Sequence, residues 1–231
     1  MSHKKIAVIG VGKYGSEIAQ NLASKGAEVV AFDLNHDKIE NIKDDVALAV
    51  TMDSTDKKAL ISQKISEMDA VIIAIGENFE ATVLTALNLK DLQINRVIVR
   101  ASGDNQIRIL NSLGVDEILE PESEIASIVA ERLINPSITA FLQLPDNYEI
   151  AEIKAPKGIM NRTLSDVQLA EKYDLTLITL KRIFEEEVKG KVTSQEHILG
   201  VLRPETVVYD TDTLVVFGTL DNVKKFLEIN E

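Results

Sequence analysis

Three glycines near the start of the chain have the spacing of a phosphate-binding turn. Residues 10–15 read Gly-Val-Gly-Lys-Tyr-Gly, the G-x-G-x-x-G pattern. Gly10 permits a tight turn, Gly12 lets the backbone approach a pyrophosphate, and Gly15 lets the next helix pack closely on the strand. The start of that helix offers free N–H groups and the positive end of its dipole. The glycine pattern therefore predicts a nucleotide or dinucleotide ligand.

The context of the glycines makes this prediction more specific. An apolar run at 6–9 precedes them, a helical pattern with Gly26 at its C-cap follows, and a second apolar run at 29–32 ends on Asp33. A strand, the glycine turn, a helix and an acid after the next strand form the dinucleotide-binding fingerprint. Asp33 can accept hydrogen bonds from ribose hydroxyls and repels a 2′-phosphate, which disfavours NADP. The alternative is a glycine-rich turn that binds nothing.

The elements that position these residues alternate between apolar runs and helical patterns up to about residue 135. This alternation predicts a parallel sheet with right-handed crossovers, and with the fingerprint a Rossmann-type α/β domain. We expect strands at 6–9, 29–32, 47–52, 70–75, 97–100 and 116–119, and helices near 36–43, 56–65, 79–92 and 104–113. Expected helix caps are Asn35, Ser54 or Thr55, Asp104 and, at a C-terminus, Gly114.

The rest of the chain predicts a second, smaller unit. A helical segment at 123–135 stops at Pro136, and an apolar piece at 138–144 follows. Further on, strands are expected at 148–155, 175–183 and 214–219, with helices at 163–172 and 221–229. The predicted organisation is a nucleotide-binding domain with a crossover helix at 1–135, a linker at 136–147 and a small α+β domain at 148–231.

Composition excludes several function classes. The formal net charge of -12 argues against binding nucleic acid or an anionic membrane surface. The absence of cysteine excludes disulfides, thiolate metal sites and a cysteine nucleophile. The start of the chain shows no signal-peptide hydrophobic region, and no apolar run approaches the ~20 residues that span a bilayer. We therefore expect a cytoplasmic protein without direct membrane insertion.

Several segments resemble one known family. They are IAVIGVGKYG at 6–15, AFDLNHDKIE at 31–40, MDSTD at 52–56, AIGEN at 74–78, VIVRASG at 97–103, LGVDEILEPE at 113–122 and RTLSDVQLAEKYDLTLITLKR at 162–182. With them the chain resembles the cytosolic RCK-domain regulatory subunits of bacterial Trk/Ktr potassium uptake systems, which carry TrkA-N and TrkA-C domains. The resemblance covers nearly the whole chain and is more specific in the first domain.

The resemblance implies a nucleotide-sensing gating subunit of potassium transport rather than an enzyme. Such subunits form dimers that assemble into a ring of eight, which docks on a potassium-translocating membrane subunit at the inner face of the membrane. In the family ATP favours the active form of the ring and ADP the inactive one, while some members bind NAD or NADH. The implied cofactors are therefore ATP/ADP or NAD(H).

Carried over by position, the resemblance also implies a pocket. It comprises Gly10, Gly12, Lys13, Tyr14, Gly15, Asp33, Leu34, Asn35, Asp53, Ser54, Ile75, Gly76, Glu77 and Arg100. Lys13 stands where ATP-binding relatives often have Arg, so it would meet a terminal phosphate as a point charge. Glu122 matches an acid that some relatives use near the phosphates through a divalent or sodium ion at the dimer interface.

Three of these residues keep a second interpretation from their sequence context alone. Asp53 ends a predicted strand and fits either an adenine contact or the cap of the next helix. Arg100 fits a phosphate contact or an interface ion pair. Glu122 is in addition a helix N-terminal acid that the dipole favours.

The C-terminal domain departs from the family pattern for cyclic di-AMP. Some relatives bind that nucleotide with an apolar pair and an Arg, and here Leu164-Ser165 and Ala170 stand at those positions. The apolar pair is half lost and the Arg is missing. The sequence therefore does not favour cyclic di-AMP, and the alternatives are dimerisation or no ligand.

An apolar stripe on the connecting segment predicts an obligate dimer interface. Its members are Ile125, Ile128, Val129, Leu133, Ile138, Phe141 and Leu142. They are more apolar than a lone domain needs on such a segment. We expect them to cross to a second subunit.

A dehydrogenase is the competing function class. Hydride transfer needs an acid or base beside the substrate carbon, commonly His, Lys or a Tyr whose pKa is lowered by a nearby Lys. None of the three histidines follows a strand where such a base belongs, and no tyrosine has a lysine four residues on. An NAD-dependent oxidoreductase and a nucleotide-binding oligomeric scaffold without a channel partner are the two alternatives to a gating subunit.

Overall fold

The computed structural model describes residues 4–188 and 191–231. The chain forms two compact units, one ending at Glu124 and the other spanning Ile125–Glu231. The expected boundary at 135 came after the crossover helix, whereas most of that helix groups with the second unit. Among the described residues, no helix is both long and apolar enough to cross a membrane.

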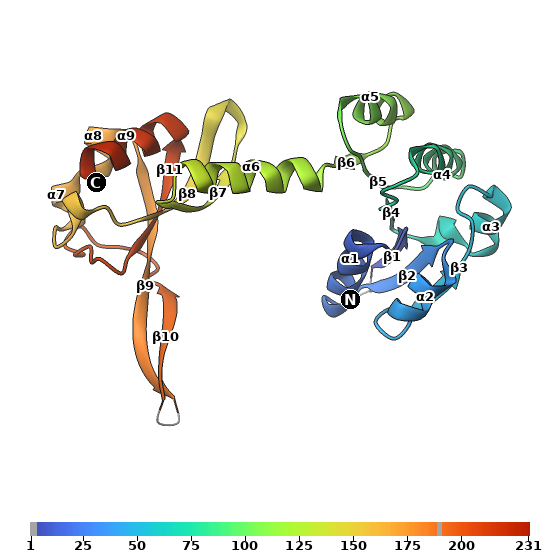
Figure 1. Cartoon of the computed structure of the whole chain (residues 1–231), viewed down its shortest axis with the longest axis horizontal. Coiled ribbons are helices and arrows are strands. Elements are labelled where there is room, and N and C mark those ends of the chain that lie inside the picture. The colour runs from blue at the N-terminus through green and yellow to red at the C-terminus, as the bar shows by residue number, and fades with distance from the viewer. Residues whose placement is uncertain (1–3, 189–190) are drawn as a thin grey trace. The chain divides into compact units, whose positions relative to one another are not determined.

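The first unit is built on a six-stranded parallel sheet (Figure 1), which confirms the Rossmann-type prediction. Its strands are β1 (Lys5–Ile9), β2 (Glu28–Asp33), β3 (Leu48–Thr51), β4 (Ala70–Ile73), β5 (Val97–Arg100) and β6 (Glu117–Leu119). Their spatial order is β3-β2-β1-β4-β5-β6. The order reverses between β1 and β4, and ligands of such sheets bind at the carboxyl edge beside the reversal.

Helices connect these strands at the expected places. They are α1 (Lys13–Ser24), α2 (His36–Ile42), α3 (Lys57–Ser62), the 3-10 turn η1 (Ile65–Glu67), α4 (Phe79–Asp91) and α5 (Asp104–Leu113). Asn35 caps α2, and Gly114 ends α5 in the left-handed region with φ 69°, as predicted. Two caps were wrong: Asp56 caps α3 in place of Ser54 or Thr55, and Gly103 precedes α5 in place of Asp104.

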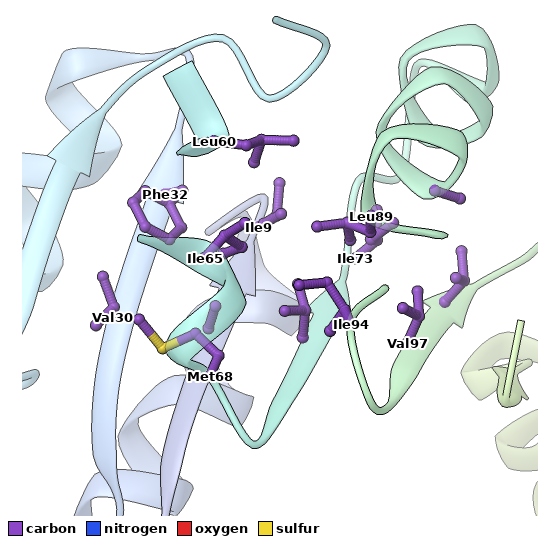
Figure 2. Close-up of a cluster of buried hydrophobic side chains, with 14 of the residues drawn as sticks. Ile9, Val30, Phe32, Leu60, Ile65, Met68, Ile73, Leu89, Ile94 and Val97 are labelled. Atoms are coloured by element: carbon purple, nitrogen blue, oxygen red, sulfur yellow. The ribbon is translucent and has the colours of Figure 1, made fainter. Parts of the chain in front are cut away.

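Both faces of this sheet are buried. Ile9, Phe32 and Ile73 point into one core, which Figure 2 shows closed by Leu60 and Ile65 from the α3 region. The neighbouring residues along the strands point to the opposite face and pack under α1 and α2. Alternate side chains of a strand face opposite sides, so a sheet covered on both faces needs continuous apolar strands.

The second unit begins on α6 (Pro121–Ile134) and contains a five-stranded antiparallel sheet. Its strands are β7 (Ile138–Gln143), β8 (Tyr148–Lys154), β9 (Thr176–Val188), β10 (Lys191–Ile198) and β11 (Thr213–Thr219), in the order β10-β9-β11-β8-β7. The helices are α7 (Leu164–Val167), α8 (Leu169–Tyr173) and α9 (Leu220–Asn230), with 3-10 turns η2 (Pro145–Asn147) and η3 (Lys157–Ile159). The α+β prediction is confirmed.

Several details of this unit differ from the expectation. The expected linker at 136–147 contains β7, which pairs with β8, and Ile138 of the expected interface stripe is fully buried in the core. The helix expected at 163–172 is broken at Gln168, whose φ of 53° is left-handed. Strand β10 was not expected. The side chain of Phe141 lies outside the described residues.

Candidate functional site

The glycine turn after β1 has the shape that its spacing predicts. Gly10 has a φ of 89°, and a Cβ there would lie 2.9 Å from the backbone nitrogen of Ile75. A Cβ on Gly15 would lie 1.9 Å from the Gly10 carbonyl oxygen, so helix and strand touch there. A Cβ on Gly12 would meet no atom within 4 Å. Two of the glycines therefore serve packing, while the third leaves an open surface.

The open surface lies at the N-terminus of α1. Gly12 is the N-cap residue, and no side chain caps the helix. The first turn contains no acidic residue, and the Lys13 side chain is exposed. The first N–H groups of a helix have no intrahelical partner and attract anions. This end of α1 can accept a phosphate without displacing a protein side chain.

Asp33 ends β2 and braces the turn. Its Oδ2 accepts a hydrogen bond from the Val11 N–H at 2.8 Å, and its Oδ1 accepts one from the Asn35 N–H at 2.9 Å. The Lys38 ammonium lies 3.8 Å from Oδ2. The Asn35 side chain is occupied in capping α2, whereas Leu34 is 72% exposed. Each carboxylate oxygen has a further lone pair, so Asp33 can brace the turn and still accept a ribose hydroxyl.

The residues after β3 are committed to local structure. Asp53 Oδ1 accepts hydrogen bonds from the N–H and the hydroxyl of Thr55, which lower the pKa of the Asp53 carboxyl. Because residues 53–55 form this turn, α3 begins only at Lys57, and its N-cap is Asp56 and not Asp53. The buried Ser54 hydroxyl pairs with the Thr85 hydroxyl of α4 at 2.9 Å. Asp53 stays exposed at the sheet edge, while Ser54 is turned into the unit.

The loop after β4 approaches the glycine turn and Arg100. Ile75 packs against Gly10, and a Cβ on Gly76 would lie 2.9 Å from a guanidinium nitrogen of Arg100. Glu77 is exposed, and Asn78 caps α4 by accepting a hydrogen bond from a backbone N–H. The Arg100 guanidinium therefore lies against the backbone of Gly76, where a side chain would meet it.

Arg100 links the sheet edge to the start of α6. Its guanidinium pairs with the Glu122 carboxylate and lies 5.4 Å from the centre of the Tyr14 ring. Burial and the Glu124 charge raise the pKa of Tyr14, and Arg100 opposes them, so the phenol stays neutral at physiological pH. The sequence left two roles for Arg100, a phosphate contact or an interface ion pair. The structure contains an ion pair of Arg100, and both of its partners lie within the first unit.

The described residues contain no group of three or more His, Cys, Asp or Glu that could hold a metal ion. Glu122 in the first turn of α6 has Arg100 as its partner. Since one carboxylate does not make a metal site, a cation at Glu122 needs ligands from a nucleotide or another subunit. The expected metal role stays a prediction.

The structure thus brings most of the expected pocket to one edge of the sheet. Three groups meet there: Gly10, Gly15 and Ile75; Asp33 and the turn at 11–12; and Arg100, Tyr14, Gly76 and Glu122. Ser54 does not join them. Sequence reasoning missed Thr85, for which the available signal was a hydroxyl one turn after Thr82 on the buried face of α4. It also missed the hydrogen bond from the Val11 N–H to Asp33, which no sequence pattern signalled.

These features define a class of protein: a doubly wound nucleotide-binding domain followed by a small α+β unit. Residues 6–121 match the TrkA-N domain family. The chain is 33% identical over 223 residues to the Ktr system potassium uptake protein C of Bacillus subtilis, covering 96% of both chains. It therefore belongs to the TrkA-N family, and its expected place among the RCK-domain regulatory subunits of Trk/Ktr systems is confirmed.

Solved structures support the same fold. The GsuK channel bound to NAD has a TM-score of 0.55 at 19% identity and matches 99% of this chain, which spans 38% of that longer protein. GsuK bound to ADP has a TM-score of 0.50 at 23% identity, with 56% of this chain and 34% of that one covered. At these identities the likeness establishes the fold.

Proposed function

We propose that this chain is a nucleotide-sensing, cytosolic gating subunit of potassium transport that acts through a separate membrane pore protein. The supporting observation is the open position at Gly12 above the uncapped start of α1, in a chain that aligns over 96% of a Ktr potassium uptake protein. The chain contributes the sensor, and the pore protein contributes the potassium path.

The proposed ligand is ATP/ADP or NAD(H), with its phosphates at the start of α1 and its ribose on Asp33. Two fold neighbours carry NAD and ADP. The exposed Leu34 beyond Asp33 offers an apolar surface to the adenine. Asp33 is already bonded to two backbone N–H groups, and its negative charge disfavours a 2′-phosphate.

The nucleotide is sensed, in this proposal, by its outer phosphate. Lys13 is the exposed cation next to Gly12, and Arg100 is the cation beside Gly76. The ion pair of Arg100 with Glu122 leaves the acid 55% exposed, and ion pairs of this kind contribute roughly 0–1 kcal/mol. A phosphate can therefore attract Arg100 and release Glu122 to a divalent or sodium ion bridging a neighbouring subunit.

Assembly completes the proposed function. No residue of α6 is fully buried within the chain, and Ile125, Val129 and Leu133 are exposed along it. We propose that this stripe pairs two subunits, that the dimers form a ring, with eight subunits as the family precedent, and that the ring sits at the inner face of the membrane through its pore partner. Cyclic di-AMP is not proposed as a ligand, since Ser165 and Ala170 replace the family's contact residues.

We further propose that the chain is not an enzyme. Its TrkA-N relatives include potassium uptake proteins. No tyrosine has a lysine four residues on, and His36, a histidine at this sheet edge, is engaged with the Thr51 hydroxyl at 3.2 Å. An NAD-dependent oxidoreductase predicts turnover of NADH with some oxidised substrate. A binding protein predicts NADH affinity without consumption.

The test is a thermal-shift panel of ATP, ADP, NADH and NADPH on the parent and on Gly12→Val. A ligand at a hundredfold excess over its Kd stabilises the folded state by about 2.7 kcal/mol. The variant keeps its fold, because Gly12 has a φ of -68° and open space around it, and loses the shift because the new side chain occupies the phosphate position.

Ser24→Val, at the opposite end of the same helix, is the control and keeps the shift. A full shift in Gly12→Val, or tight NADPH binding by the parent, would contradict the proposed site.

A further inference from the structure

The second unit contains an acidic pocket that the nucleotide site does not use. Its volume is about 310 Å³, within the range of small-ligand sites. Residues of α6, β7, β8 and the start of α9 line it, among them Ser127, Glu131, Tyr148, Glu149 and Asp221. All of them belong to the unit that begins at Ile125.

Glu149 is the unusual member of this lining. It occupies an inward position of β8, in the alternating series that continues with Ala151 and Ile153. The residue is only 4% exposed, and among the described residues its Oε1 has no hydrogen-bond partner. A buried carboxylate oxygen without a donor is costly, and such groups in native proteins mark a ligand, a water or a functional role.

The nearby cation is engaged elsewhere. The Lys224 ammonium of α9 lies 3.4 Å from the Glu131 carboxylate, which also accepts a hydrogen bond from the Asn135 side-chain amide. Burial raises the pKa of Glu149, the Glu131 charge raises it further, and Lys224 opposes both. Three carboxylates, those of Glu131, Glu149 and Asp221, therefore line the pocket, and Lys224 outside the lining is paired with Glu131.

The chemistry that would satisfy Glu149 is a compact cation with N–H donors. A bare metal ion fits poorly, because no three acidic or imidazole side chains among the described residues, those of this pocket included, are grouped so that they could hold one. An ammonium carries three donors, and the hydroxyls of Ser127 and Thr219 provide further acceptors.

We propose that this pocket binds a small protonated amine whose ammonium donates to Glu149 Oε1. The ligand class is a mono- or diamine rather than an inorganic ion. The pocket volume accommodates the carbon chain of the amine, and the carboxylates favour its positive charge. The proposal is independent of the nucleotide site, because every residue it uses lies in the second unit.

The experiment is calorimetric titration of the full chain with 1,4-diaminobutane at about pH 8 and constant ionic strength. We expect saturable binding of one amine per chain and no binding of the uncharged 1,4-butanediol. Glu149→Gln should raise the Kd for the amine roughly tenfold or more, since a charge-assisted hydrogen bond is lost. Glu205→Gln, which removes an exposed acid of the same unit, should leave the Kd unchanged.

A second variant guards against a folding defect in the first. Ser127→Leu keeps every carboxylate and narrows the pocket, so it should weaken the amine as well. Equal affinity in the parent and both pocket variants would overturn the proposal. Saturable binding of KCl or MgCl₂ that Glu149→Gln abolishes, with no amine binding, would also overturn it and assign an inorganic cation.

Discussion

Asp33 combines a structural and a binding role in one carboxylate. Both of its oxygens accept backbone N–H groups, one from the glycine turn and one from the start of α2. Its side chain is 9% exposed; the bond from the Val11 N–H is partly buried, whereas the bond from the Asn35 N–H is exposed. Removing the carboxylate therefore affects the shape of the turn as well as any ribose contact.

We predict that Asp33→Ala weakens nucleotide binding by about 1–3 kcal/mol, the size of a lost charge-assisted hydrogen bond with its desolvation. It should also lower the melting temperature without ligand, because the Val11 N–H loses its acceptor. Calorimetry and thermal melts measure the two effects. Asp44→Ala, at an exposed acid in the same unit, should change neither. Unaltered ATP and NADH affinity in Asp33→Ala would rule out the ribose contact.

The raised pKa of Glu149 implies that the stability of the fold depends on pH. Its folded-state pKa is raised above the ordinary value of 4.5, so the native state binds this proton more tightly than the unfolded state. The stability gained from the proton is complete below pH 4.5 and is lost as pH rises through the raised pKa. Glu131, Asp221 and Lys224 are the charged groups that face it.

Glu149→Gln should therefore be more stable than the parent at neutral pH, with the difference closing toward pH 4. Urea unfolding of both proteins across this range, in buffer free of amines, measures the difference. Glu205→Gln should track the parent at every pH. Curves for Glu149→Gln that parallel the parent throughout would show that Glu149 has an ordinary pKa.

At the scale of elements, α6 presents a row of exposed apolar side chains. Leu133 is 76% exposed, Ile125 59% and Val129 46%, and none of its residues is buried. Exposed apolar side chains in a row commonly mark an interface. The burial of Ile138 in the second core removes that residue from the expected stripe, whereas Leu142 in the next strand is 60% exposed.

We predict that the parent is a dimer or larger at micromolar concentration and that Leu133→Asp dissociates it, because a charge would have to be buried in the interface. Light scattering measures the mass of both. Ile109→Asp, at an apolar position of α5 that is 44% exposed, is the matched control and should keep the parent's mass. A monodisperse monomer for the parent at this concentration would contradict the proposed interface.

The sequence predicted those elements whose pattern is local. The parallel strands were recognisable because both faces are buried, which makes them continuous apolar runs. Strand β10 was missed because its sequence, KVTSQEHI, is mostly polar and pairs along only one edge. The break at Gln168 and the cap at Asp56 depend on backbone turns that several residue types can make, so residue type alone did not reveal them.

The candidate site was predictable to a similar degree. The roles of Gly10 and Gly15 follow from spacing, and the structure contains the close contacts that these roles require. The partner of Ser54 on α4 and the pairing of Arg100 with Glu122 join residues far apart in the chain. Such pairs depend on how helices and strands pack, which a single sequence does not specify.

At the scale of the whole molecule, gating requires a ligand with different affinities for two shapes of the assembly. In the proposed mechanism the triphosphate reaches past Gly12 to Lys13 and, through a cation, to Glu122, whereas ADP lacks the outer phosphate for this contact. We predict that Lys13→Ala and Glu122→Gln reduce the difference between the ATP and ADP states far more than they reduce nucleotide affinity. A coupling of about 1–3 kcal/mol is ordinary for such a switch.

Small-angle scattering with ATP and ADP, or potassium uptake in vesicles reconstituted with the pore subunit, measures this difference. Lys25→Ala, beyond the other end of α1, and Glu124→Gln, beside Glu122, are the controls and should respond to nucleotide as the parent does. If Lys13→Ala and Glu122→Gln keep the full difference, nucleotide must be sensed through its adenosine end or the segment after Asn135.

The strand order also sets when the glycine turn can form during synthesis. β1 is made first, yet it pairs on one side with β4, where Ile6 lies opposite Ala70, and Gly10 packs against the backbone of Ile75. At about 5–20 residues per second, the ribosome needs on the order of 3–13 s to make that partner. The nascent chain therefore carries its phosphate-binding motif unformed until β4 emerges. The part of the site that is written first in the gene is completed only when later strands have been translated.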